Sequence, residues 1–282
     1  AQKSIEEARD FHSAINPDLL LESLFKVGTS AGGRRPKAVI NVNMTTGECY
    51  SGQVPAPVPG FIPSIIKFDE HNSIPTTRIE YSYYEMAISN GINMMPSHLI
   101  ECHNETHFLT ERFDRHEDHK IHIQTLAAMN PLSSSYEDLF DTALRIDLTP
   151  AEISQLFHRM VMNVLCGNVD DHNKNFSFLM DIDGIWRITP AYDFTFTIDP
   201  SAPGYVNRHS LSVNGKIQNI SNADLLTVAD RFNIKSASSI IEKSVTAAKQ
   251  FHKYAEQNKV PERWIDIITS EISERIRSLS KL

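Results

Sequence analysis

One polar stretch between two apolar segments constrains this 282-residue chain more than any other feature. It spans residues 164–178 and contains Asp-Asp-His-Asn-Lys-Asn at 170–175. Apolar residues recur at helical spacing over 157–165, which predicts a helix just before the polar residues. The run Phe-Ser-Phe-Leu-Met at 176–180 predicts a buried strand just after the polar residues. We therefore expect a polar loop held between two core elements, which is more typical of a site than of a solvated connection.

Three side chains in and after this stretch have the chemistry to serve one metal–phosphate centre. Asp170 can accept a proton from a hydroxyl, and Asn175 can offer an oxygen to Mg²⁺ together with the carboxylate of Asp193. A transferred phosphoryl group needs positioning and charge neutralisation more than covalent help, so one base and two metal-directed oxygens suffice. A calcium loop starting at Asp171 fails, because its sixth position is Phe176 instead of Gly and its twelfth is not Glu.

The composition is that of an ordinary globular protein. Hydrophobic residues make up 41% and charged residues 22% of the chain, and no apolar run reaches eighteen residues, which predicts no membrane span. The first ten residues lack the apolar segment of a signal peptide, and three scattered cysteines without C-x-x-C indicate a reducing, cytoplasmic location with no zinc site or disulfide framework. A formal net charge of -8 disfavours direct binding of nucleic acid.

A glycine-rich segment at 27–37 precedes a predicted strand at 38–43. Backbone N–H groups in such a segment can wrap phosphates, although a simple hairpin turn is the more usual explanation of the segment taken alone. It is not a Walker A loop, because Arg34 and Arg35 replace the Lys-Ser/Thr of that motif.

Lys67 ends the apolar strand predicted at 61–69, where it can meet phosphates or lie at a sheet edge. The helix predicted at 80–90 offers Glu80 or Glu85 as its ion-pair partner, and the two alternatives stay open at this point.

The remaining pattern is mixed. Strands are predicted at 99–102 and 107–110, followed by Glu-Arg-Phe-Asp-Arg at 111–115, and a hairpin turn is predicted at 181–184. Helices are predicted at 121–129, 135–146, 150–165, 221–232, 236–257 and 261–280. His209, in a loop rich in Pro, Gly and Asn, is expected at the surface.

Taken together, these motifs resemble the HipA-type serine/threonine kinases, the toxin half of bacterial toxin–antitoxin modules. The resemblance covers about 27–214 and rests on the segment at 30–37, Ile-Ile-Lys-Phe-Asp around Lys67, the helix from Glu80, Glu-Arg-Phe-Asp-Arg, the loop at 170–177 and Pro-Ala-Tyr-Asp at 190–193. The spacing D-x-x-x-x-N is also that of the protein-kinase template. The resemblance to HipA-type kinases implies an α+β, bilobal protein-kinase-like fold, with a small mixed β-rich N-lobe at 1–113 and a larger, mostly α-helical C-lobe at 114–282.

The resemblance also implies roles for individual residues. Asp170, Lys67 and Asp193 would be catalytic, and Asn175 and Asp193 would bind Mg²⁺. The residues that would border ATP are Gly32, Gly33, Arg34, Arg35, Pro36, Lys37, Lys67, Glu111, Arg112, Phe113, His172, Asn173, Lys174, Asn175, Tyr192 and Asp193, with the backbone of 111–113 holding adenine. Ser30, or the adjacent Thr29, would be autophosphorylated, and the added charge would expel the loop and stop ATP binding.

The length of the chain that resembles these kinases points to the compact, HipT-like branch of the family. The phosphate loop begins near residue 28, so the small N-terminal subdomain of larger HipA kinases is expected to be absent, and Arg34-Arg35-Pro36 departs from the usual loop residues. The implied partners are an aminoacyl-tRNA synthetase as substrate, a helix-turn-helix antitoxin and a small HipS-like protein, without direct contact to nucleic acid or membrane.

Two other functions share part of this pattern. A small-molecule kinase of the aminoglycoside or choline type has the same D-x-x-x-x-N and a later Asp, but the flanks at 111–115 and 176–178 favour a protein kinase. A kinase-shaped, non-catalytic partner of an antitoxin has no physical need for Asp170, Asn175 and Asp193 together.

Overall fold

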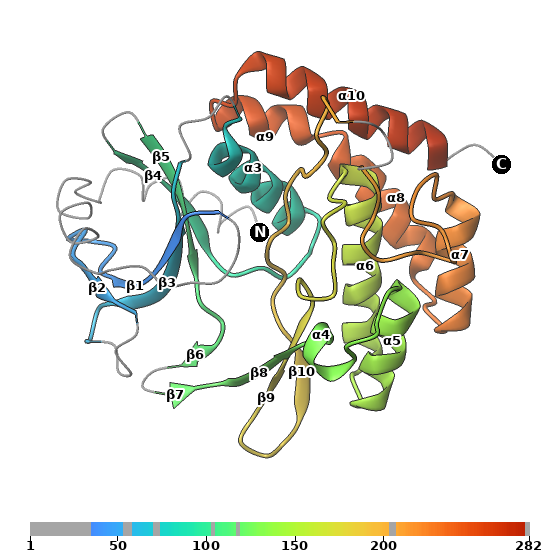
Figure 1. Ribbon diagram of the computed structural model, residues 1–282, viewed down its shortest axis with the longest axis horizontal. Coiled ribbons are helices and arrows are strands. Elements are labelled where there is room, and N and C mark those ends of the chain that lie inside the picture. The colour runs from blue at the N-terminus through green and yellow to red at the C-terminus, as the bar shows by residue number, and fades with distance from the viewer. Residues whose placement is uncertain are drawn as a thin grey trace.

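The computed structural model describes residues 35–52, 58–69, 74–102, 105–116, 119–202 and 207–279. A β-rich part and a larger helical part lie side by side, with helix α3 (Thr76–Ser89) between them (Figure 1). This arrangement confirms the predicted α+β class. Within these ranges, the helices lack the combination of length and apolar content that a bilayer-crossing segment needs.

The β-rich part is an antiparallel, five-stranded sheet in the order β2-β1-β3-β5-β4. Its strands are β1 (Lys37–Val42), β2 (Cys49–Ser51), β3 (Ile62–Lys67), β4 (Ser97–Cys102) and β5 (Glu105–Glu111). Ile40, Ile66 and Leu109 are buried in one cluster on one face. Because side chains alternate along a strand, Lys67 lies on the opposite face from Ile66, toward α3. The register pairs Lys67 with Lys37.

Helix α3 (Thr76–Ser89) connects the two parts. Tyr83 on this helix is fully buried, and its ring centroid lies 5.4 Å from that of Phe194 and 5.3 Å from that of Phe251. Its hydroxyl donates to the carbonyl of Cys166 at 2.6 Å. The helix begins one turn before the predicted start at residue 80, since Thr76 and Thr77, despite their low helix propensity, are buried there.

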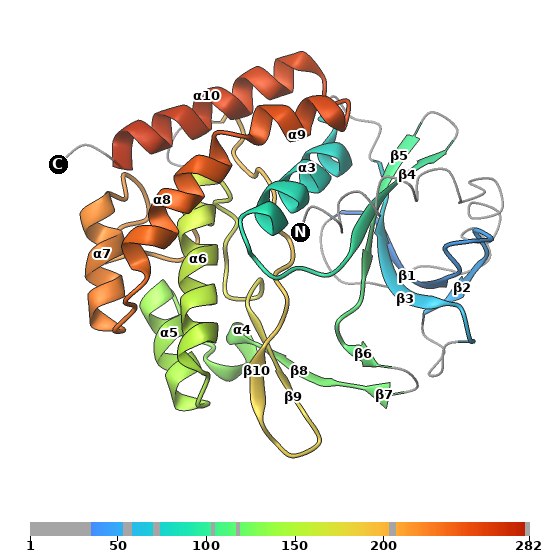
Figure 2. The same cartoon turned by 180° about the vertical axis from the view of Figure 1, so that it is seen from behind.

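The helical part is built around α6 (Pro150–Cys166), which packs against three other helices (Figure 2). These are α5 (Tyr136–Arg145), α8 (Ala237–Ala248) and α10 (Glu262–Leu279). Thr149 and Glu152 form a capping box at its start, and Gly167 ends it in the left-handed conformation. The other helices are α4 (Leu126–Met129), α7 (Asn222–Arg231) and α9 (Phe251–Gln257).

Two predicted helices are wrong in part. Residues 121–129 contain strand β8 (His122–Thr125) before α4, because β8 pairs with β9 (Ser177–Met180), which also pairs with β10 (Trp186–Ile188). Pairing across the chain thus overrides the local helical pattern. The predicted helix at 236–257 is divided into α8 and α9, so that Phe251 turns toward Tyr83. Two short strands, β6 (Arg115–His116) and β7 (His119–Lys120), complete the described elements.

His158 on α6 predicts a pH dependence of stability. Its Nε2 lies 2.7 Å from Nδ2 of Asn90, an amide donor, so the ring nitrogen must accept and the ring must be neutral. Burial, with the nearby charges of Lys243 and Arg159, lowers the pKa of His158 to about 4. The unfolded chain, with a histidine pKa near 6.5, binds a proton that the folded chain excludes as pH falls toward 4.

We therefore expect His158→Gln to reduce the loss of stability on acidification. By proton linkage, the parent should lose about 2 kcal/mol more of its free energy of unfolding than the variant between pH 7.5 and pH 5. Urea denaturation at the two pH values measures this difference. Parallel pH profiles of the two proteins would contradict the assignment.

Candidate active site

Lys67 is held between two carboxylates from different parts of the chain. Its Nζ lies 2.5 Å from Oε1 of Glu80 on α3 and 2.5 Å from Oδ1 of Asp193. Burial alone would lower the pKa of Lys67, but the two carboxylates outweigh it and raise the pKa above its usual value. Glu85, the alternative partner, instead accepts a hydrogen bond from Asn258 at 2.6 Å. The structure therefore selects Glu80 as the ion-pair partner of Lys67.

Hydrogen bonds of the backbone of Asp170, from Asn175 and to the hydroxyl of Thr197, hold the polar loop that follows α6. Gly167 has φ +66°, and a Cβ there would lie 2.9 Å from Cδ1 of Ile198, so only glycine fits without strain. The N–H of Asp170 donates to Oγ1 of Thr197 at 3.0 Å, and the carbonyl of Asp170 accepts from Nδ2 of Asn175 at 2.8 Å. The Asn175 amide nitrogen thus closes the loop, which leaves its Oδ1 as the atom available to a ligand.

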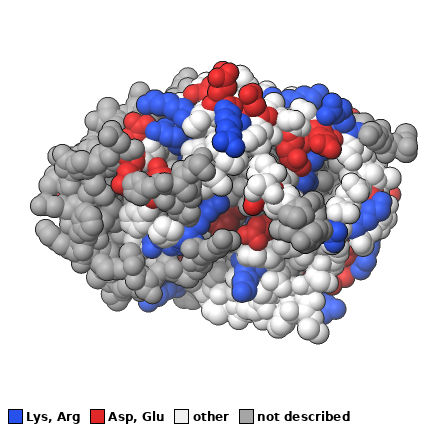
Figure 3. Space-filling view, turned by 45° about the horizontal axis from the view of Figure 1, so that its top comes forward, with Lys and Arg blue, Asp and Glu red and all other residues white. Residues whose placement is uncertain are grey.

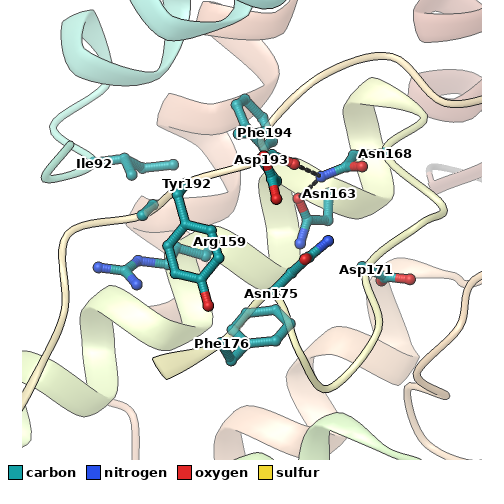
Figure 4. A pocket seen from close by; sticks show the side chains of 11 residues that line it. Ile92, Arg159, Asn163, Asn168, Asp171, Asn175, Phe176, Tyr192, Asp193 and Phe194 are labelled. Carbon is teal, nitrogen blue, oxygen red and sulfur yellow. Dashed lines mark hydrogen bonds between the residues drawn. The ribbon is translucent and has the colours of Figure 1, made fainter. Parts of the chain in front are cut away.

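Asp193 and Asn175 line one small cavity of about 20 Å³, with the side chains that Figure 4 shows around it. Nδ2 of Asn168 donates to Oδ1 of Asn163 at 2.9 Å and to the carbonyl of Asp193 at 3.4 Å, the two dashed contacts in Figure 4. Asp193 has φ +49°, a conformation that a non-glycine residue adopts only where its surroundings hold it. Asn168 is therefore one of the groups that aim this carboxylate.

The charge state of Asp193 suits a cation. Burial would raise the pKa of its carboxyl, but Lys67 first, and then Lys37 and Arg35, lower it below its ordinary value. The carboxylate therefore stays ionised at neutral pH. Together with Oδ1 of Asn175 it makes an all-oxygen donor pair, and one or two protein oxygens plus phosphates and waters are what Mg²⁺ requires. The residues present fit that ion.

The segment before β1 reaches the same place. Arg35 Nη1 lies 3.8 Å from Oε2 of Glu80, and Lys37 pairs with Lys67 at the ends of β1 and β3. A hydrogen bond fixes Pro36: its carbonyl oxygen accepts from the N–H of Phe68 at 3.0 Å. The structure therefore brings Arg35 and Lys37 to the Lys67 ion pair. Thr29, Ser30, Gly32, Gly33 and Arg34 lie outside the described residues.

The predicted adenine-binding backbone at 111–113 is partly occupied by the protein itself. The N–H of Glu111 donates to the carbonyl of Pro96 at 3.0 Å, and that of Arg112 donates to Pro63 at 2.8 Å. The Phe113 ring packs on Tyr192, with centroids 5.7 Å apart and planes at 33°. We therefore narrow the predicted contact at 111–113 to the Phe113 N–H and the carbonyl groups of the segment.

The side chains of this segment have their own environments. The Arg112 guanidinium makes two hydrogen bonds to Asp114, at 2.7 Å and 2.6 Å. Burial raises the pKa of the Glu111 carboxyl above its ordinary value.

The loop residues at 172–174 and Tyr192 take different positions. Nε2 of His172 lies 3.9 Å from Oδ1 of Asp170. The Asn173 amide donates to the carbonyl and hydroxyl of Ser133, both at 3.1 Å, so it ties the loop to the turn before α5. The side chain of Lys174 is exposed, and its carbonyl accepts from the Tyr192 hydroxyl at 2.8 Å. Burial raises the pKa of Tyr192 to about 12.

Sequence reasoning missed several residues around this loop. Asn163, Asn168 and Thr197 are polar side chains in otherwise apolar surroundings, which was the available signal. The prediction that His209 lies at the surface is wrong: its side chain is buried and its Nδ1 lies 2.8 Å from Oδ2 of Asp171. No local sequence pattern predicts the His209–Asp171 contact, because the two residues are 38 positions apart.

The surface charges do not gather into one basic face in the view of Figure 3. Basic and acidic side chains are interspersed there, and acidic side chains lie in a hollow near its centre with basic ones beside it.

Comparison with known proteins decides the family. The profile described as HipA-like C-terminal domain matches residues 29–255. The chain belongs to this family. It is a kinase-like family, and the solved structures that resemble the chain agree with that fold.

Among solved structures, the chain resembles HipA of Shewanella oneidensis MR-1, which was solved with HipB and operator DNA. The TM-score is 0.64 at 15% identity, over 94% of this chain and 70% of that chain. It also resembles the Helicobacter pylori proinflammatory kinase CtkA, with a TM-score of 0.55 at 16% identity, over 79% of this chain and 89% of that one. At these identities the likeness shows the fold alone.

Two Sinorhizobium fredii proteins match part of the sequence. The candidate kinase Y4mE is 28% identical over 139 residues, and the candidate kinase Y4dM is 25% identical over 115 residues. The matches cover 44% and 39% of this HipA-like chain, but only 33% and 28% of those relatives.

Proposed function

We propose that this HipA-like chain is an ATP- and Mg²⁺-dependent protein serine/threonine kinase. The observation that carries the proposal is the three-way contact of Lys67 with Glu80 and Asp193, next to the loop that bears Asp170 and Asn175. Cations and metal-directed oxygens side by side suit a triphosphate, and an exposed carboxylate near them suits a hydroxyl acceptor.

Each side chain has a definite task in this proposal. Lys67, kept cationic by its two carboxylates, binds phosphate oxygens, and Glu80 holds it in place when a nucleotide competes for it. Asn175 and Asp193 would hold Mg²⁺, which would neutralise charge on the phosphates. Asp170 accepts the proton of the attacking hydroxyl. The N-lobe at 1–113 would supply the phosphate-binding cations, and the C-lobe at 114–282 the base and the metal ligands.

The wider setting follows from the family resemblance. We propose that the chain acts in the cytoplasm as the toxin of a HipA-type or HipT-type toxin–antitoxin system. A helix-turn-helix antitoxin and a small HipS-like protein would be its partners, and an aminoacyl-tRNA synthetase its substrate. The Shewanella oneidensis HipA structure, which contains HipB, supports an antitoxin partner.

The test is a phosphosite map. The parent and Asp170→Asn are incubated with Mg-ATP, alone and with bacterial lysate, and phosphorylated sites are identified by mass spectrometry. We expect phosphate on Ser30, with Thr29 as the alternative, and on a lysate protein, in the parent only. Transfer to an aminoglycoside or to choline would support the small-molecule kinase instead, and no transfer would support a non-catalytic partner.

Glu80→Gln is expected to weaken binding of a non-hydrolysable Mg-ATP analogue. Loss of one charge-assisted hydrogen bond, about 1.5–3 kcal/mol, corresponds to roughly tenfold or more in dissociation constant. The neutral amide of the variant makes no ion pair with Lys67, so Asp193 is left as the ion-pair partner of this lysine in the free protein. A fluorescence titration with the analogue measures the change.

Glu85→Gln is the matched control, since Glu85 is on the same helix, equally buried and bonded to Asn258. It should leave the dissociation constant within about threefold, which is under 1 kcal/mol. Equal weakening by both variants would show that Glu80 acts on the fold and has no specific effect on Lys67.

A further inference from the structure

Asp171, the neighbour of the proposed base, is a fully buried carboxylate. Its Oδ2 accepts from the Tyr136 hydroxyl at 2.7 Å and lies 2.8 Å from Nδ1 of His209, and its Oδ1 accepts from the N–H of Ser210 at 2.8 Å. Figure 4 shows this side chain pointing away from Asn175. Burying a carboxylate is costly unless hydrogen bonds replace its water, so these three contacts fix where Asp171 lies.

His209 continues this set of contacts toward the last helix. The His209 side chain is 2% exposed, and its Nε2 lies 3.3 Å from Nη1 of Arg275 on α10. The tautomer with a proton on Nδ1 satisfies both neighbours, because it donates to Asp171 and accepts from Arg275. Arg275 also donates to the carbonyl of Val164 at 3.1 Å and to Glu271 at 2.7 Å. The Asp171 carboxylate is thus connected to α10 and to the end of α6.

The direction of the Asp170 side chain depends on the contacts that hold Asp171. Its side chain is 65% exposed, so its direction follows the backbone that carries it. On one side, Thr197 Oγ1 accepts from the N–H groups of Val169, at 2.7 Å, and of Asp170, at 3.0 Å. On the other side, the backbone is held through the buried Asp171 carboxylate. If Asp171 were released, the backbone at 169–170 would keep the Thr197 contacts, the bond from Asn175 to the Asp170 carbonyl and the bond from the N–H of Ser210 to the Val169 carbonyl, but it would lose its buried side-chain anchor.

We infer that His209 is a positioning residue for phosphoryl transfer: through Asp171 it fixes the backbone that aims Asp170, and through Arg275 it fastens this loop to α10. The inference rests on the proposed kinase function for its kinetic consequence. Its structural consequence, a loop at 168–175 whose order depends on His209, stands independently of that function. Displacing a catalytic group by about 1 Å costs up to roughly a hundredfold in rate.

The outer side of this network faces a cavity of about 220 Å³, lined by His209 and Arg275 together with Val164, Ile217 and Glu274. A cavity of this size has room for a molecule such as imidazole, which makes chemical rescue feasible once the His209 ring is removed.

The test compares two substitutions at one position. In His209→Asn, Nδ2 takes the place of Nδ1 and still donates to Asp171, whereas His209→Phe keeps an aromatic ring but loses the contacts to both Asp171 and Arg275. We expect His209→Phe to lower kcat by about 10–100-fold with KM for ATP changed less than about threefold, and His209→Asn to stay within about fivefold of the parent. Hydrogen exchange at 168–175 should be at least about tenfold faster in His209→Phe, with the rest of the chain unchanged.

His209→Gly with added imidazole covers the case in which the phenylalanine variant does not fold. Recovery of kcat and of slow exchange with millimolar imidazole supports the inference, and no recovery overturns it. Unchanged kcat and exchange in His209→Phe also overturn it, as does a parallel loss of kcat, ATP affinity and thermal stability, which indicates a purely structural residue. If the parent itself transfers no phosphate, the proposed function fails, and the exchange data alone decide whether His209 positions the loop.

Discussion

Asp170→Asn is expected to lower kcat for phosphoryl transfer by about 10²–10⁴-fold, the usual contribution of a general base. The amide has the same shape as the carboxylate but cannot accept the proton of the attacking hydroxyl. The Asp170 backbone contacts to Thr197 and Asn175 do not involve its carboxylate, so the loop should keep its conformation. The dissociation constant for Mg-ATP should therefore stay within about threefold of the parent value.

Single-turnover kinetics with radiolabelled ATP, together with an independent binding titration, separates these two quantities. Asp230→Asn on α7 is the matched control, because it makes the same chemical change on an exposed carboxylate outside the polar loop. The control should retain the parent kcat. An Asp170→Asn protein with the parent rate would show that another group accepts the proton or that none is needed.

The sequence predicted those parts of the structure whose determinants are local. The helix before the polar loop follows from apolar spacing, the Thr149 cap and Pro150, and its bounds of 150–166 differ from the predicted ones by one residue. The strand that carries Lys67 follows from a short apolar run, and the α+β class from the order of such elements. The sequence also placed Asp193 at the same site as Lys67, and the two side chains are in contact.

What could not be predicted depends on contacts between distant segments. Glu80 and Glu85 are both buried on one helix, and the tertiary packing of α3 decides their partners: Glu80 contacts Lys67, and Glu85 contacts Asn258, more than 170 residues away. For the same reason His209 was expected at the surface, since its acceptor Asp171 lies in another segment. Strand β8 formed where a helix was predicted, because β9 supplies its hydrogen bonds.

Asp193→Asn is expected to abolish most of the effect of Mg²⁺ on nucleotide binding and to lower kcat by about 10²–10³-fold, the usual cost of losing one preorganised electrostatic contact. The amide keeps an oxygen in place but loses the negative charge that attracts the ion. In the free protein, Lys67 would also lose one of its two carboxylates and keep Glu80.

The measurement is a four-state cycle: the dissociation constant of an ATP analogue for parent and variant, each with Mg²⁺ and with a chelator. Without Mg²⁺, the variant should bind the analogue at least as tightly as the parent, because the Asp193 carboxylate no longer repels the triphosphate. With Mg²⁺, the parent should gain affinity and the variant should not, whereas Asp183→Asn, in the exposed turn between β9 and β10, should behave as the parent. An equal gain in Asp193→Asn would remove this residue from the metal site. A loss of affinity both with and without Mg²⁺ would instead mean that Asp193 acts by holding Lys67. The Lys67–Asp193 contact forms without the metal, whereas a metal-binding role of Asp193 can affect affinity only when Mg²⁺ is present.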